Sequence, residues 1–192
     1  KPARGERPLW DFPPGTLHRR EVATYLVDRA LRWQLVPQTV LRPEAPLGPG
    51  SMQEWIAGPA SPPELDRSRV EAELRRLAAL DVLVNNADRK AAHLLVGDDL
   101  GLRAIDHGVT FNEEFKLRTV LSELGGEPVP EPVLTDLGSL LAERERITTL
   151  RSELGSLLSR SEVRAFFSRA RELLGSRRYP LLHPYWGRPS EW

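Results

Sequence analysis

The 192-residue chain contains no cysteine, and this absence removes several chemistries at once. Disulfide bonds, thiolate catalysis and cysteine-ligated zinc all need a side chain that is missing here. No apolar run approaches the ~20 residues that a membrane-spanning helix needs, so the sequence predicts no membrane span. A reducing compartment is compatible with the lack of cysteine, and we expect a cytoplasmic protein.

The chain also lacks an excess of charge of either sign. Its 27 basic and 27 acidic side chains give a formal net charge of zero. No general attraction to nucleic acid or to an acidic membrane is therefore expected. The single methionine, Met52, lies inside the sequence, so we expect further residues upstream of Lys1.

The first part of the sequence predicts one helix and two short strands. Residues 1–15 are rich in proline, glycine and arginine and indicate an irregular connection. Apolar residues then recur at helical spacing, which predicts a helix of roughly 16 residues capped by Thr16. Two β-prone segments follow, at 36–41 and 52–56.

The second part is mainly helical in pattern. Residues 64–80 carry an apolar face and predict a long amphipathic helix. Residues 81–111 then read as a unit of loop, strand, strand and loop, and residues 135–175 as helices with breaks near Thr148 and Leu158.

A proline- and glycine-rich stretch at 58–63 suggests a boundary between two lobes. We therefore expect an α+β protein with a small mixed lobe, 1–58, and a mainly helical lobe, 59–192. This order of elements is that of a two-lobed, kinase-like plan.

Two acids are placed where a phosphotransferase would use them. Asp88 lies in a short loop before the predicted strand 94–96, and Asp106 follows the predicted strand 102–105. In phosphoryl transfer one carboxylate orients the attacking group, and a second holds the metal on the nucleotide phosphates. The spacing therefore favours this chemistry.

Five ordered sequence blocks, spanning Lys1 to Phe111, carry a resemblance to a known family. The chain resembles a bacterial, chiefly actinobacterial, phosphatidylinositol 3-/4-kinase-like family, and is more distantly similar to type II phosphatidylinositol 4-kinases and HipA-type kinases. The blocks are KPARGERP, REVATYLVD, GSMQEWI, NNADRKAAHLL and AIDHGVTF. The resemblance implies a protein-kinase-like fold, of which the N-terminal part of the small lobe is missing from this chain.

The resemblance also implies roles for individual residues. Lys1 is similar to the lysine that contacts nucleotide phosphates, and Glu21 to the acid that holds this lysine in place. Asp88 matches the catalytic aspartate, and Arg89, its neighbour in the motif, is assigned to the catalytic residues with it. Asp106 matches the acid that binds Mg²⁺ or Mn²⁺. The hinge that would hydrogen-bond adenine corresponds to Gln53, Glu54, Trp55 and Ile56.

One residue departs from the family pattern. Relatives carry a metal-binding asparagine five residues after the catalytic aspartate, whereas this chain has His93. Imidazole suits Mn²⁺ better than Mg²⁺, which prefers oxygen ligands. His93 is therefore either an altered metal ligand or a structural polar group, and catalysis is either adapted or weak.

Simpler readings of the same residues stay open. Asn-Asn-Ala-Asp is good turn chemistry, so Asp88 could serve only as a turn residue, and Asp106 could simply end a strand. Lys1 and Glu21 could be ordinary surface charges.

We expect an ATP-dependent phosphotransferase that transfers the γ-phosphoryl group to a hydroxyl of a protein or a soluble small molecule. A lipid acceptor is disfavoured because no strong basic patch or amphipathic insert is evident. The alternative is a nucleotide-binding pseudokinase that acts as a scaffold or regulator. The sequence does not indicate an oligomeric state.

Overall fold

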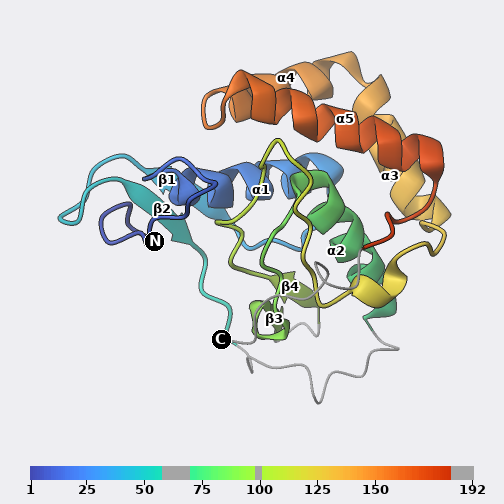
Figure 1. The fold of residues 1–192 in the computed structure, drawn as a ribbon, viewed down its shortest axis with the longest axis horizontal. Coiled ribbons are helices and arrows are strands. Elements are labelled where there is room, and N and C mark those ends of the chain that lie inside the picture. Colours follow the sequence, from blue (N-terminus) through green and yellow to red (C-terminus); the bar gives the residue numbers. More distant parts are fainter. Residues whose placement is uncertain (58–69, 98–100, 183–192) are drawn as a thin grey trace.

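The computed structural model describes residues 1–57, 70–97 and 101–182 of the chain. Five α-helices and two small antiparallel sheets make up this part, so the protein is α+β as the sequence predicted. Figure 1 shows the β1–β2 sheet at one side of the molecule and helices α3, α4 and α5 on the other, with α1 running between them. None of the helices in the described ranges is long and apolar enough to cross a membrane.

The first sheet pairs β1 (Thr39–Arg42) with β2 (Gly50–Gln53). The two strands are antiparallel, and Val40 lies opposite Met52. The start of the chain extends this sheet, because Pro2 forms an isolated antiparallel bridge with Gly50. A Cβ at Gly50 would lie 2.4 Å from the carbonyl oxygen of Lys1, so only glycine allows this approach.

Helix α1 (Leu17–Leu31) forms where the periodicity predicted it. Thr16 occupies the N-cap position, but its side chain makes no capping bond. The carboxylate of Glu6 takes over that role by accepting from the backbone N–H groups of Gly15 and Leu17, at 2.7 and 3.0 Å. Arg32 ends the helix in the left-handed conformation.

Helix α2 (Glu71–Val84) continues past the point where the pattern predicted its end. We placed the loop unit from residue 81 onward, whereas the helix runs to Val84 and ends at Asn85, which adopts φ +53°. The sequence analysis ended the helix at Leu80, but residues 81–84 are also buried and extend the helix by one more turn. The predicted lobe boundary at 58–63 and the predicted helix start at 64 lie outside the described residues.

The second sheet confirms the predicted strand pair almost to the residue. The short 3₁₀ turn η2 (Ala91–His93) leads into β3 (Leu94–Val96), which pairs with β4 (Leu102–Ala104) in antiparallel register. Because β3 follows Asp88 closely and β4 ends just before Asp106, the hairpin brings the two acid-bearing loops to the same end of the sheet.

The remaining chain forms the 3₁₀ turn η3 (Ser122–Leu124) and three helices, α3 (Glu131–Ala142), α4 (Arg144–Gly155) and α5 (Arg160–Ser176). The predicted break near Thr148 was wrong, since the chain turns at Glu143 instead. The break near Leu158 is confirmed: Ser159 caps α5, its hydroxyl accepting from the Glu162 N–H while Glu162 accepts from the Ser159 N–H.

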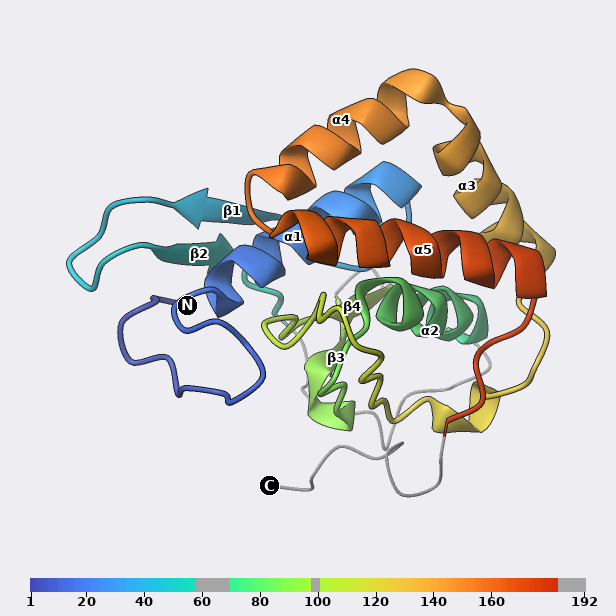
Figure 2. The same cartoon turned by 45° about the horizontal axis from the view of Figure 1, so that its top comes forward.

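One continuous apolar cluster joins these elements. It includes buried residues of α1, α2, α3, α4 and α5, together with Leu102 and Ala104 of β4. Figure 2 shows α5 lying alongside α2. Arg20 of α1 reinforces this packing through a buried ion pair with Glu162 of α5, at 2.5 Å.

Candidate phosphate and metal site

Lys1 lies between two carboxylates that come from distant parts of the chain. Its Nζ is 2.5 Å from Oε1 of Glu21 and 2.5 Å from Oδ1 of Asp106. The pairing with β2 fixes Lys1, helix α1 carries Glu21, and the turn after β4 carries Asp106. The structure therefore brings together three residues that the sequence analysis had assigned to one site.

The charges of this cluster shift the pKa values of Lys1 and Asp106. Burial alone would lower the pKa of Lys1, but Glu21 and Asp106 outweigh burial and raise it above its ordinary value. Burial would likewise raise the pKa of Asp106, but the Lys1 ammonium outweighs it and lowers that pKa. The Lys1 ammonium and the Asp106 carboxylate therefore stabilise each other's charged forms, and Asp106 keeps 44% of its side chain exposed.

Glu21 also fixes the backbone beside Asp106. Its Oε2 accepts from the His107 N–H at 2.9 Å, so one carboxylate holds both the lysine and the turn. The side chain of Glu21 is almost fully buried. Asp106 itself has φ +60°, a conformation that Asp and Asn tolerate better than most residues. Loss of Glu21 would thus disturb both partners of the site.

The loop that carries Asp88 is built around a second acid, Asp81, which the sequence analysis missed. Asp81 is fully buried in the last turns of α2 and accepts from the Arg89 guanidinium, with Nη2 3.0 Å from Oδ1. The Asn86 side chain and the Thr119 hydroxyl donate to the same carboxylate, at 3.0 and 3.3 Å. An acid inside the apolar run 77–84 was the available signal, because a buried charge needs partners.

Arg89 connects the two acid-bearing loops. Besides binding Asp81, its Nη1 donates to the carbonyl oxygen of Ile105, the residue before Asp106, at 2.8 Å. Its side chain is completely buried, so it cannot contact a substrate. We assign Arg89 a positioning role in place of the catalytic one that the motif suggested.

Asp88 is half-exposed beside this buried network. Its backbone N–H donates to Oδ1 of Asn86 at 3.0 Å, which is the turn chemistry that the sequence indicated. Its carboxylate lies 3.1 Å from Nζ of Lys90. The turn thus presents the Asp88 carboxylate at the surface, whereas Asp81 and Arg89 remain inside.

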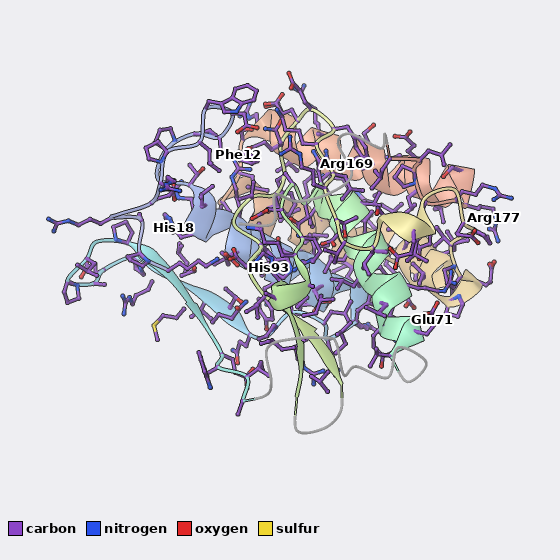
Figure 3. All side chains as sticks on the ribbon, turned by 60° about the horizontal axis from the view of Figure 1, so that its bottom comes forward. Phe12, His18, Glu71, His93, Arg169 and Arg177 are labelled. Carbon is purple, nitrogen blue, oxygen red and sulfur yellow. The ribbon has the colours of Figure 1, made fainter. Side chains whose placement is uncertain are left out.

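His93 is the last residue of the η2 turn, between the loop of Asp88 and the turn of Asp106, and it is labelled in Figure 3. Its Nε2 is 3.7 Å from Oδ2 of Asp106, and its Nδ1 accepts from the Lys90 N–H at 3.3 Å. Burial lowers the pKa of His93, although Asp106 and Asp88 oppose this shift. Among the residues that the structure describes, no group of three or more carboxylates and imidazoles is arranged to hold a metal ion.

The predicted hinge lies at the end of β2. Gln53 donates from its side chain to the Thr39 hydroxyl at 2.9 Å, and the Glu54 N–H donates to the Gln38 carbonyl at 2.8 Å. The Trp55 side chain is 89% exposed, and Ile56 is partly buried. The Glu54 N–H is therefore already bonded within the protein.

A cavity of about 360 Å³ adjoins Lys1 and Asp106. It lies between the N-terminal segment 1–9, the first turn of α1 and residues 106–109. The described residues thus define an α+β protein in which Lys1 and Asp106 border a cavity.

Comparison with known proteins places the chain in a family. The chain is 36% identical to Protein Rv2133c of Mycobacterium tuberculosis over 205 aligned positions, which cover 84% of this chain and 73% of that protein. It therefore belongs to the same family as that mycobacterial protein. No family model matches the sequence.

Proposed function

We propose that this protein is an ATP-dependent phosphotransferase with a two-lobed, kinase-like fold of the phosphatidylinositol 3-/4-kinase-like type. The observation that carries this proposal is the position of the Lys1 ammonium between Glu21 and Asp106. A lysine held by a helix acid, next to a second acid in the turn after a strand, is the arrangement that orients nucleotide phosphates and their metal in kinases.

The order of the elements supports the fold assignment. The segment that carries Lys1 lies beside β2, β2 pairs with β1, and α1 connects the lysine segment to β1 in sequence. The hinge segment follows β2 directly, and the β3–β4 hairpin separates Asp88 from Asp106. This is the sequence of parts expected from the small-lobe lysine to the metal-binding acid of a kinase.

The residues present fit a divalent ion in this role. Mg²⁺ is commonly bound through one or two carboxylates together with substrate phosphates, so Asp106 alone is a sufficient protein ligand. A bound ion would neutralise charge on the transferring phosphoryl group. Lys1 would then exchange its contact with Asp106 for the phosphates, while Glu21 keeps it in place.

Asp88 would orient the acceptor hydroxyl. Its carboxylate is accessible, and an Asp in this role needs only hydrogen-bond reach to the hydroxyl proton. We infer that the acceptor is a protein or a soluble small molecule, because the neutral chain offers no general attraction to an acidic membrane surface.

Transfer from γ-labelled ATP tests the proposal. The protein is incubated with Mg²⁺ or Mn²⁺ and a panel of hydroxyl acceptors, and labelled product is measured. Asp88→Ala is expected to reduce transfer at least 100-fold while ATP affinity changes little, and Asp106→Ala to abolish transfer through loss of the metal. Near-normal turnover in Asp88→Ala would show that the assignment is wrong.

One observation favours a pseudokinase as a second candidate. Nδ1 of His93 accepts a hydrogen bond from Lys90, so the neutral ring carries its proton on Nε2, the nitrogen that faces Asp106. An Nε2 that bears a proton cannot bind a metal. ATP binding without transfer or hydrolysis under both metals, in the protein and in a His93→Asn variant alike, would support this candidate.

A further inference from the structure

A second cavity lies away from Lys1 and Asp106, along helix α5. Its volume is about 510 Å³, within the range of roughly 300–1,000 Å³ that is usual for small-ligand sites. One wall is the face of α5 from Ala165 to Ser176, and the opposite walls come from α2, the 113–115 segment and residues 178–180. Apolar side chains in these walls include Val82, Phe115 and Leu173.

Arg169 supplies a buried cation to this cavity. The residue is only 8% exposed, and Figure 3 labels it among the side chains around α5. Its Nε donates to the Leu83 carbonyl at 2.9 Å and its Nη1 to the Asn112 carbonyl at 3.2 Å. Its Nη2 is buried and has no hydrogen-bond partner among the described residues.

No carboxylate in the described part of the chain compensates this charge. Burial lowers the pKa of Arg169 to about 10, and no neighbouring charge contributes to that shift. Two acids line the same cavity, but neither forms an ion pair with Arg169: Glu113 accepts from the Ser161 hydroxyl, and Glu172 is exposed on α5. A buried guanidinium with free donors is costly unless an anion satisfies it.

We propose that this cavity binds a small molecule that carries one anionic group, a carboxylate or a phosphate monoester, on an apolar body. Nη2 of Arg169 is covered in the empty cavity, so the ligand shifts the lining side chains to reach it, and the anion then accepts hydrogen bonds from it in the charge-assisted manner typical of guanidinium groups. The apolar body packs against Val82, Phe115 and Leu173. An inorganic anion alone would leave these apolar walls uncovered.

This cavity is separate from the proposed phosphotransferase site, but it lies near the loop that carries Asp88. The Asn112 carbonyl that binds Arg169 also accepts from the side chain of Asn85, the residue at which α2 ends. A ligand bound to Arg169 would therefore be linked through the Asn112 carbonyl to Asn85, where the Asp88 loop begins. It would not contact Lys1 or Asp106. Binding is measured without ATP, so its outcome is independent of phosphoryl transfer.

Calorimetric titration tests the proposal with three probes of one shape. Benzoate and phenyl phosphate carry the two candidate anions, and benzyl alcohol is the neutral control. Saturable binding of at least one anionic probe, with benzyl alcohol at least tenfold weaker, is expected. Arg169→Gln should weaken the anionic probe at least tenfold, whereas Arg164→Gln, an exposed arginine of the same helix, should leave it unchanged.

A second variant covers the case in which Arg169→Gln does not fold. Ser168 is exposed and lines the cavity, so Ser168→Trp should fill the space without removing any bond of Arg169, and binding should be lost. The proposal is overturned if neither anionic probe saturates, if benzyl alcohol binds equally well, or if Ser168→Trp binds as the parent protein does. The stronger of the two anionic probes identifies the group that the site prefers.

Discussion

Two loops meet at the candidate site, and they are held in opposite ways. The loop from Asn85 to Arg89 rests on Asp81, whose carboxylate is fully buried and accepts from three different side chains. The turn at Asp106 is held from outside by Lys1, whose side chain is half-exposed, and from inside by Glu21. One loop is part of the core, whereas the other is bound partly by contacts that water can reach.

This difference suggests how the two acids are used. A buried network fixes the Asp88 loop whether or not a ligand is present, because breaking it leaves a buried charge. The Lys1–Asp106 contact is accessible to water, so exchanging it for another polar partner would cost little. The structure thus separates a permanent support from an exchangeable contact, and the predictions below probe each in turn.

Removal of Asp81 should have the largest effect. Asp81→Ala leaves the Arg89 guanidinium buried without its counter-charge, so we expect the free energy of unfolding to fall by about 3–5 kcal/mol. Urea denaturation measures this change. The matched control is Glu71→Ala on the same helix, which breaks only an exposed pair with Arg75 and should cost less than about 1 kcal/mol. Equal losses in both variants would contradict a special role for Asp81.

The buried acid Asp28 predicts a pH dependence of stability that is separate from the Lys1–Asp106 pair. Burial raises the pKa of Asp28 to about 6, although its carboxylate accepts from the backbone N–H groups of Leu35 and Val36. The folded state therefore binds this proton more tightly than the unfolded state, whose ordinary pKa is 3.8. The contribution to stability is full below about pH 4 and is lost as the pH rises through about 6.

The size of this effect follows from the shift. A difference of about 2 pKa units corresponds to about 3 kcal/mol of stability lost between pH 4 and pH 7. Asp28→Asn cannot titrate, so the difference in unfolding free energy between parent and variant should change by this amount across that range. Denaturation curves recorded at both pH values provide the measurement, and parallel pH profiles would count against it.

Glu21→Gln tests the inner support of the Asp106 turn. Glutamine still offers an oxygen to the His107 N–H but no charge to Lys1, so we expect a loss of about 1 kcal/mol in unfolding free energy. The pKa of Lys1 should fall, because one of the two acids that raise it has been removed. Titration of Lys1 by NMR, with denaturation in parallel, would detect both changes. An unchanged Lys1 pKa would contradict the pairing seen in the structure.

Lys1→Met should change stability least and nucleotide binding most. Lys1 is 51% exposed, so its loss should cost less than about 1 kcal/mol. ATP affinity, measured by calorimetry, should nevertheless fall at least tenfold under the proposed function. A large loss of stability would instead indicate that the lysine contact is structural and not exchangeable.

Local patterns predicted part of this fold well. Helix α1 and the β3–β4 hairpin follow from periodicity over a few residues. The turn at Glu143 was missed because the apolar spacing continues from Leu140 through Leu150, and neither glycine nor proline marks the break. A helix boundary without such a residue is set by packing between helices, which a single sequence does not display.

The clustering of Lys1, Glu21 and Asp106 was predictable from the sequence, but the support of the neighbouring Asp88 loop was not. Lys1, Glu21 and Asp106 were named from a family resemblance, since contacts across 20 and 105 positions leave no local pattern. Asp81 was overlooked because it continues a helix and lies outside the quoted motif. Its three donors come from two other loop positions and residue 119, and only the folded chain brings them together.

Glycine at position 50 has a consequence for the position of Lys1. The Lys1 carbonyl lies where a methyl group would be, so a single added carbon would push the first residues away from β2. Such a change alters no charge and touches no acid, yet it would withdraw the ammonium from between its two partners. A larger residue at position 50 would therefore displace Lys1 by steric contact alone, without changing any charged group of the cluster.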